Sequence, residues 1–321
     1  MSTKYNDNNP PNTRSQSARH RSDIRCDSEQ SGAPESGDMT CIEQYRESGF
    51  ATVRGVFNAA EVAEMAAEAD RMQARGLQYR ATFRHQNILY VIQEDPQAGR
   101  VLRFMQWPAY VSPVLQRYRT DQRMLDLLSP LIGSDMKQII NQLIWKQPHS
   151  ECSSYAYHQD HRFRRPASAY RELASSFVQT AIAIDAHTAD NGCISLFKGS
   201  HKLGDLELEL EDSVYKGACS MERALARGLD EKDLVEILLE PGDVALWNPY
   251  TVHGSGQNCS TGNRRTYLNG YVTANNCDRG EWAFRDGVPC ELGEPVLVQY
   301  EDLVNRPEPH YVDGSPHPFR S

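Results

Sequence analysis

The sequence lacks any run of apolar residues that approaches the roughly 20 needed to cross a membrane. It also lacks a basic excess, since its formal net charge is -9 over 321 residues, and this disfavours nucleic acid and anionic lipid as partners. None of its eight cysteines forms a CxxC pair, which disfavours zinc-ribbon and thioredoxin-like proteins. The first residues contain no apolar segment typical of a secretory signal. We therefore expect a cytoplasmic protein with no membrane or nucleic-acid partner.

Composition divides the chain into two parts. Residues 1–36 are rich in Asn, Ser, Arg and Pro and contain almost no aliphatic side chains. Such a segment cannot bury enough surface to offset the entropy lost on ordering, so we predict a disordered tail. The remainder, residues 37–321, is predicted to form one folded domain.

Helical patterns dominate the first third of this domain. A short helix is predicted from Cys41 to about Gly49. The segment Asn58–Arg75 has apolar residues at helical spacing, with Asn58 as the N-cap and Gly76 as the end signal. A further helix is predicted over about 112–132.

Short apolar strands separated by turn signals follow. The turns are indicated by Asp-Asn-Gly at 190–192 and Pro-Gly-Asp at 241–243. Helices first and many short strands later predict a mainly-β fold, an antiparallel sandwich or barrel with helices on one side. The predicted strands are Ala51–Val56, Ile139–Trp145, Phe177–Ile184, Cys193–Phe197, Leu234–Leu239, Val244–Trp247 and Thr266–Val272.

Three residues have the types and spacing of an open metal site. His158 and Asp160 are two positions apart in the segment YHQDH, and in a strand such residues point to the same face. His253 follows the Pro-Gly-Asp turn, a predicted strand and a short connection, so it can lie on a strand that returns to the first. Two histidines and one carboxylate are the facial triad of non-haem Fe(II) oxygenases, which leaves positions free for a co-substrate and O2.

An arginine eleven residues after His253 strengthens this interpretation. Arg264 begins a predicted strand, where its guanidinium can bind a carboxylate through two hydrogen bonds. The co-substrate 2-oxoglutarate requires such a group for its distal carboxylate. Arg265 points to the opposite face of the strand, and we favour Arg264 on spacing.

Several motifs occur in order along the chain: EQYRESGFATVRGVFNAAEVAEMAAEAD, YHQD, DNGCISLFKGSHK, PGDVALWNPYTVHGSGQN and the following NRR. Over about residues 41–275 the sequence resembles the phytanoyl-CoA dioxygenase family, which includes ectoine hydroxylase. It departs from the family pattern at Lys198, where Pro is usual. The resemblance implies a double-stranded β-helix (a jelly-roll, cupin-like fold) with flanking helices that uses Fe(II), 2-oxoglutarate and O2. It assigns His158, Asp160 and His253 to iron, and Arg264 to the distal carboxylate of 2-oxoglutarate.

Asp160 also selects between reactions. Iron halogenases of similar sequence have Ala or Gly at this position, which leaves room for chloride, so a carboxylate here favours hydroxylation, desaturation or cyclisation of an aliphatic C–H. The substrate is expected to be a small organic molecule, a natural-product or metabolic intermediate, with release of succinate and CO2. The alternative is a metal-binding β-barrel protein, or an isomerase or lyase without oxygen chemistry, which would not need Arg264.

Further polar residues are candidates for the pocket. The resemblance, with strand parity, gives candidates for contact with 2-oxoglutarate: Gln142, Lys146, Thr180 and Ser255. The basic run after the metal strand is either a solvated loop or a binding site for a carboxylate or phosphate of the substrate, and it comprises Arg162, Arg164 and Arg165. Loops over 78–110 and 205–232 are expected to contact the substrate. Trp247 is expected in the core, and His187 at the surface.

Overall fold

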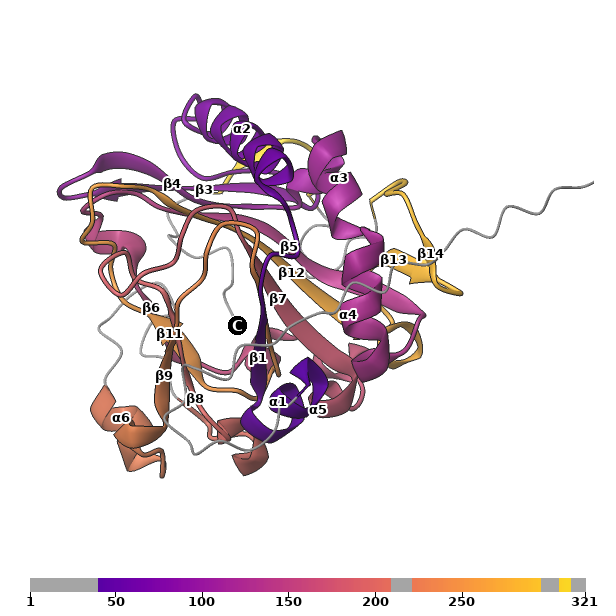
Figure 1. The fold of residues 1–321 in the computed structure, drawn as a ribbon. Coiled ribbons are helices and arrows are strands. Elements are labelled where there is room, and N and C mark those ends of the chain that lie inside the picture. The colour runs from indigo at the N-terminus through magenta and orange to yellow at the C-terminus, as the bar shows by residue number, and fades with distance from the viewer. Residues whose placement is uncertain (1–39, 209–220, 296–305, 313–321) are drawn as a thin grey trace, which may run out of the picture.

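The computed structural model describes residues 40–208, 221–295 and 306–312, and the tail predicted over 1–36 lies outside these ranges. Two antiparallel sheets face each other, with helices on the outside of the larger one (Figure 1). Apolar side chains from both sheets meet between them, among them Trp247 and Ala181 from the larger sheet and Leu196 from the smaller. This is the mainly-β arrangement with flanking helices that the sequence predicted.

The larger sheet has the strand order β1-β10-β7-β12-β5-β4-β3-β2-β15, and a short hairpin of β13 and β14 joins it at β5. Its long central strands, β5 and β12, pair over ten positions. The strands are β1 (Phe50–Val53), β2 (Phe83–His85), β3 (Ile88–Asp95), β4 (Gly99–Gln106), β5 (Met136–Lys146), β7 (Phe177–Ala183), β10 (Val244–Trp247), β12 (Arg264–Thr273), β13 (Glu281–Arg285), β14 (Val288–Pro289) and β15 (His310–Tyr311).

The smaller sheet has the order β6-β11-β8-β9. It consists of β6 (Tyr155–His158), β8 (Ile194–Phe197), β9 (Leu234–Ile237) and β11 (His253–Ser255). The strands expected from the sequence are all observed, with ends within three residues of the prediction.

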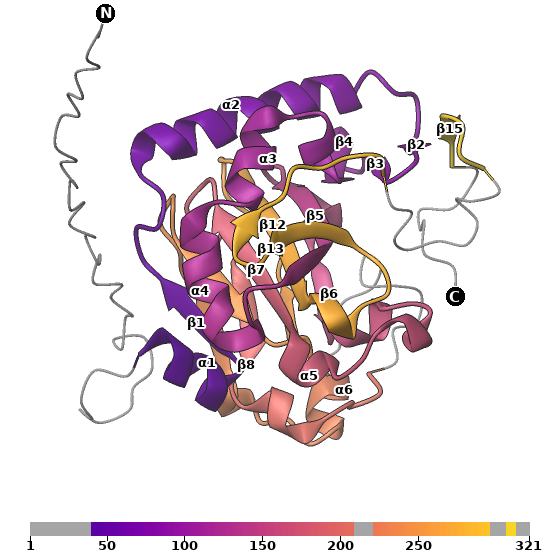
Figure 2. The same cartoon turned by 90° about the vertical axis from the view of Figure 1, so that its right-hand side faces the viewer.

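Helices α2, α3 and α4 pack on the outer face of the larger sheet, and Figure 2 shows α2 running across its top. The helices are α1 (Cys41–Ser48), α2 (Ala59–Gly76), α3 (Pro113–Arg119), α4 (Gln122–Ile132), α5 (Leu173–Ser176) and α6 (Met221–Ala226). No helix among the described residues is long and apolar enough to cross a membrane.

Asn58 caps α2 as predicted, since its side chain accepts hydrogen bonds from the amides of Ala60 and Glu61. Gly76, however, does not end the helix through a left-handed turn. It is the last helical residue, and a Cβ there would lie 2.8 Å from Leu102 and 2.9 Å from Tyr90. Glycine is required at this position because α2 lies directly on β3 and β4.

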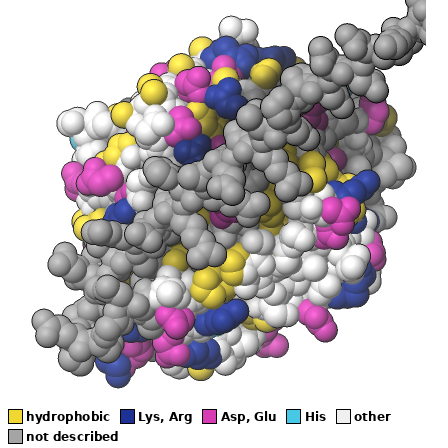
Figure 3. Space-filling model, turned by 45° about the vertical axis from the view of Figure 1, so that its right-hand side comes forward, with side chains coloured by type: hydrophobic (Ala, Val, Ile, Leu, Met, Phe, Trp, Pro, Cys, Tyr) yellow, Lys and Arg dark blue, Asp and Glu magenta, His cyan; other side chains and the backbone are white. Residues whose placement is uncertain are grey.

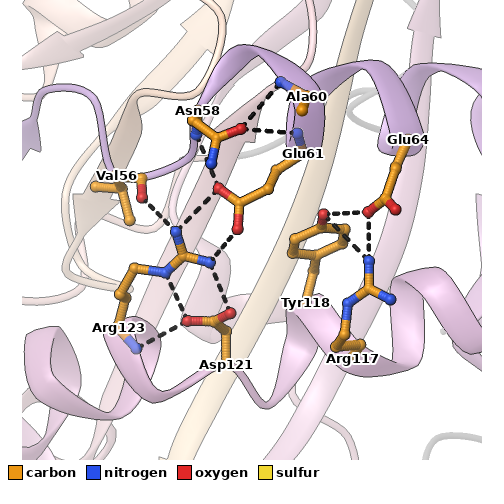
Figure 4. A network of polar contacts seen from close by, with 9 residues as sticks. All are labelled: Val56, Asn58, Ala60, Glu61, Glu64, Arg117, Tyr118, Asp121 and Arg123. Carbon is orange, nitrogen blue, oxygen red and sulfur yellow. Dashed lines mark hydrogen bonds and ion pairs between the residues drawn. The ribbon is translucent and has the colours of Figure 1, made fainter.

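The single helix predicted over 112–132 is two helices. Ser112 caps α3, and the chain breaks at Thr120 before Asp121 caps α4. Arg123, just inside α4, is bound by Glu61 of α2 and by Asp121, as Figure 4 shows. The same figure shows Glu64, Arg117 and Tyr118 linking α2 to α3. The break therefore lets both short helices attach to α2.

The segment 78–110, expected to be a loop, contains three strands instead. These strands, β2, β3 and β4, extend the larger sheet beyond β5. Apolar residues of this segment, such as Leu89 and Leu102, are fully buried. The other expected loop, 205–232, lies partly outside the described residues and contains α6. On the face shown in Figure 3, basic and acidic side chains are interspersed.

Candidate metal centre

The three predicted ligands meet at one point between the sheets. His158 and His253 are directly paired across β6 and β11, and their ring centroids are 4.2 Å apart. The Nε2 atom of His158 lies 3.6 Å from Oδ1 of Asp160, and that of His253 lies 3.7 Å from Oδ2. The three donor atoms fall within 4.8 Å of one another, and all three residues are buried. One ion can contact all of them at once.

Asp160 reaches this point from a 3-10 turn, Asp160–Phe163, and not from the strand itself. Gln159 between the ligands stays extended, with φ -117° and ψ 129°, so the alternation of the strand carries on to Asp160. The Gln159 side chain points the other way, where its amide donates to the carbonyls of Gly204 and Tyr250. This anchoring fixes the direction of both ligands.

Backbone carbonyls set the histidine tautomers. Nδ1 of His158 lies 2.6 Å from the carbonyl oxygen of Ala156, and Nδ1 of His253 lies 3.0 Å from that of Thr251. Because Nδ1 donates its proton there, each Nε2 keeps a lone pair for a metal. Burial, reinforced by His158, lowers the pKa of His253 to about 4, so its ring is neutral at pH 7. Two imidazoles that direct Nε2 to the same point, together with a carboxylate, fit Fe(II).

Trp247 holds the carboxylate. Its indole N–H donates to Oδ2 of Asp160 at 3.0 Å, and its ring lies against His253. Burial favours the protonated acid, but His253 and His158 outweigh it and hold the pKa of Asp160 well below its usual range. We had expected Trp247 to be only a core residue. No local motif marks it, because the contact joins positions 87 residues apart.

Two buried cations lie beside the metal ligands. Arg264 and Lys146 are paired across β12 and β5, and both donate to the carbonyl of Gly192. Lys146 also donates to Oγ of Ser255, two residues after His253, at 2.7 Å. Burial and the charge of Arg264 place the pKa of Lys146 far below its ordinary value. Three residues selected from the sequence, Arg264, Lys146 and Ser255, are therefore adjacent.

Arg265 faces the other way, as its strand position predicted. It binds Asp185 through two hydrogen bonds of 2.8 Å and also contacts Asp70 of α2. His187, expected at the surface, is instead fully buried and lies 3.0 Å from Oγ1 of Thr266. Its burial beside Arg264 lowers the pKa of His187 well below its ordinary value.

The other two co-substrate candidates differ in placement. Gln142 lies on the same face of β5 as Lys146, four residues away. Thr180 does not face the site: it shares a face of β7 with Val178 and Ile182, which pack under the helices, and it donates to the carbonyl of Asn269. The expectation of a co-substrate contact for Thr180 is wrong, because strand parity directs its side chain away from the metal.

The three arginines after the ligand strand have different environments. Arg162 forms an exposed ion pair with Asp205, and Arg165 is exposed to solvent. Arg164 is buried, with its guanidinium carbon 5.9 Å from the centroid of the Phe177 ring. The solvated-loop interpretation holds for the first two residues and not for the third.

Comparisons with known proteins agree with this geometry. The family model described as phytanoyl-CoA dioxygenase matches residues 45–266. Dioxygenase lolE1 of Epichloe uncinata is 33% identical over 129 residues, which are 40% of this chain and only 43% of that protein's length. A probable alpha-ketoglutarate-dependent hypophosphite dioxygenase of Stutzerimonas stutzeri is 25% identical over 72% of this chain and 77% of its own.

Among solved structures, EctD from S. alaskensis with bound Fe superposes with a TM-score of 0.57 at 19% identity, covering 86% of this chain and 90% of that one. This likeness shows the shared fold. The family model spans well over half of the sequence and includes all four residues of the predicted iron and carboxylate site. The chain belongs to the phytanoyl-CoA dioxygenase family of Fe(II)- and 2-oxoglutarate-dependent oxygenases.

Proposed function

We propose that this protein hydroxylates, desaturates or cyclises an aliphatic C–H of a small organic substrate, with iron at His158, Asp160 and His253. The observation that carries the proposal is the buried cation pair, Arg264 and Lys146, beside this triad. Ser255 joins the two parts, since it contacts Lys146 and lies two residues from His253 on β11. The two-residue step from His253 to Ser255 spans roughly 7 Å along the strand, a distance that a five-carbon diacid can bridge.

The electrostatics of the pair favour an anion. In the described part of the chain no carboxylate forms an ion pair with Arg264 or Lys146, and their acceptors are carbonyls and the hydroxyl of Ser255. Nε of Arg264 is buried, and no described residue accepts a hydrogen bond from it. Burial and the charge of Arg264 disfavour the protonated form of Lys146, so a carboxylate between the two side chains would stabilise positive charge on both and complete their hydrogen bonds. The distal carboxylate of 2-oxoglutarate has this chemistry.

When bound, iron and 2-oxoglutarate supply the activation of O2, with succinate and CO2 as products. The chain contributes positions and electrostatics. The Nδ1 contacts of both histidines direct their Nε2 atoms, and Trp247 fixes the carboxylate of Asp160. Side chains from both sheets bury the site and exclude water from it. Because Asp160 occupies the third ligand position, no vacancy is left for a halide, and this supports oxidation of C–H over halogen transfer.

Anaerobic addition of Fe(II) and 2-oxoglutarate tests the proposal. Wild type should develop a visible metal-to-ligand charge-transfer band, and His158→Ala should abolish it. Arg264→Ala and Lys146→Met should each raise the 2-oxoglutarate concentration that gives half of the maximal band absorbance by at least roughly 10-fold, because each variant loses a hydrogen bond from a charged group. The matched control is Arg265→Ala, whose side chain faces away and which should titrate like wild type.

A wild-type protein that binds Fe(II) but shows no band and forms no succinate would support the alternative, a metal-binding barrel or an isomerase. We further propose that the protein acts in the cytoplasm and has no nucleic-acid or membrane partner. The relative named as a hypophosphite dioxygenase supports a small substrate for this fold.

A further inference from the structure

Arg164 is a buried cation that forms no salt bridge with any residue that the structure describes. Its side chain is 7% exposed, and neither Nε nor Nη1 has a hydrogen-bond partner among the residues described. Its guanidinium carbon lies 5.9 Å from the centroid of the Phe177 ring, and the carboxylate of Asp160, which faces His158 and His253, is close enough for its charge to interact with that of Arg164. A buried charge is stabilised when its donors are hydrogen-bonded, and Nε and Nη1 of Arg164 are available to an anion from outside the chain.

Gln179 is a second unpartnered polar group on the same surface. It is 1% exposed, and both its Oε1 and Nε2 lack hydrogen-bond partners in the described structure. Gln179 and Phe177 alternate along β7, so their side chains share one face of the strand. Buried amides in native proteins are almost always hydrogen-bonded, and two orphaned atoms on one side chain indicate a site for a ligand.

Both residues lie next to the metal ligands. Gln179 is directly paired with Trp247, whose indole holds Asp160. Arg164 follows Asp160 by one 3-10 turn, and Phe163 between them packs against the ring of His158. Gly270, opposite Gln179 on β12, leaves the space that these side chains occupy, since a Cβ there would lie 2.8 Å from Phe177 and 2.9 Å from Gln179.

We propose that Arg164 and Gln179 form the substrate subsite, and that the substrate carries an oxyanion, a carboxylate or a phosphonate, which Arg164 binds. Gln179 hydrogen-bonds a neighbouring polar group of the same molecule. The assignment rests on the proposed function, because it takes the triad as the reacting centre. The subsite is separate from the Arg264 and Lys146 pair, which lies at the other end of β12 from Gly270.

The test measures anion binding without turnover, on protein loaded with Mn(II) and 2-oxoglutarate. The probes are methylphosphonate and propionate, with propionamide as the neutral match of propionate, and chloride keeps the ionic strength constant. Thermal melting reports binding, because a ligand that binds only the folded state raises Tm. Arg162→Gln and Arg165→Gln are matched controls, because each removes one positive charge near Arg164. Arg162 is paired with Asp205, and Arg165 is exposed to solvent.

At least one oxyanion should raise Tm in wild type and in both controls, and propionamide should not. Arg164→Met should weaken that binding by roughly 10- to 100-fold, Gln179→Leu should weaken it less, and Arg164→Lys should keep part of it. Preference for methylphosphonate or for propionate identifies the kind of oxyanion. Arg164→Lys also serves if the methionine variant fails to fold.

The assignment is overturned if wild type and Arg164→Met bind the anion equally, if wild type shows no oxyanion effect beyond that of chloride, or if propionamide binds as well as propionate. A variant that loses affinity for 2-oxoglutarate instead would assign Arg164 to the co-substrate and also refute it. Failure of the proposed function is distinguishable, because it appears as a missing charge-transfer band in wild type.

Discussion

The contact between Trp247 and Asp160 makes a quantitative prediction for metal affinity. Replacing Trp247 by Phe keeps a buried ring but removes the indole N–H that donates to Oδ2 of Asp160 at 3.0 Å. A hydrogen bond to a charged group contributes about 1.5–3 kcal/mol. We therefore expect the dissociation constant for Fe(II) or Mn(II) to rise by roughly 10- to 100-fold, in line with the loss of other groups that orient metal ligands.

A second tryptophan supplies the control for the cavity that this replacement leaves. Trp145 is 1% exposed, faces the helix layer, and has an indole nitrogen with no partner in the described structure. Trp145→Phe should therefore cost packing but leave metal affinity unchanged. Isothermal titration with Mn(II) under anaerobic conditions measures both variants. The reasoning fails if Trp247→Phe binds metal as tightly as wild type, or if both variants lose the same affinity.

Three further outcomes are expected on stability. Gly242→Ala should lower the free energy of unfolding by more than about 2 kcal/mol, because φ at Gly242 is +95° and a Cβ would lie 2.1 Å from the carbonyl oxygen of Phe57. A denaturant titration in which the variant keeps the midpoint of wild type would contradict this. Burial opposes ionisation of Asp95, but hydrogen bonds from three backbone amides and Ser150 lower its pKa from 3.8 to about 2. The ionised side chain therefore contributes fully to the free energy of unfolding above pH 4, and this contribution is lost as the pH falls through 2. Asp95→Asn should thus cost about 2 kcal/mol at pH 7, and its unfolding curve should converge with wild type in acid; a gap that is independent of pH would count against it. Arg265→Ala should cost about 1–3 kcal/mol in urea unfolding through its lost bonds to Asp185, and a smaller change would mean that this pair is screened by solvent.

Much of the metal centre could be predicted because its signals are local or fixed by parity. His158 and Asp160 are two apart on an extended chain, and Arg264 and Arg265 must face opposite sides of one strand. The same parity rule fails for Thr180 only because the sequence does not say which face of β7 is inward. Apolar residues line both faces of that strand, so alternation gives no direction.

The parts that escaped prediction depend on contacts between distant segments. Trp247 contacts Asp160 across 87 positions, and only the fold distinguishes Arg162, which pairs with Asp205, from the buried Arg164. The predicted loop over 78–110 contains β2, β3 and β4, and these strands join the larger sheet through the pairing of β4 with the distant β5. Gly76 resembled a helix end signal, although the reason for glycine there is the approach of β3 and β4.

The position of β11 has a kinetic consequence. This three-residue strand carries His253 and Ser255, and it lies inside its sheet, paired with β6 on one side and β8 on the other. Moving the backbone of His253 away from the site therefore requires breaking both ladders at once. A bound ion would thus have a ligand whose backbone stays in place, and the amides of β11 should be strongly protected from exchange with deuterium.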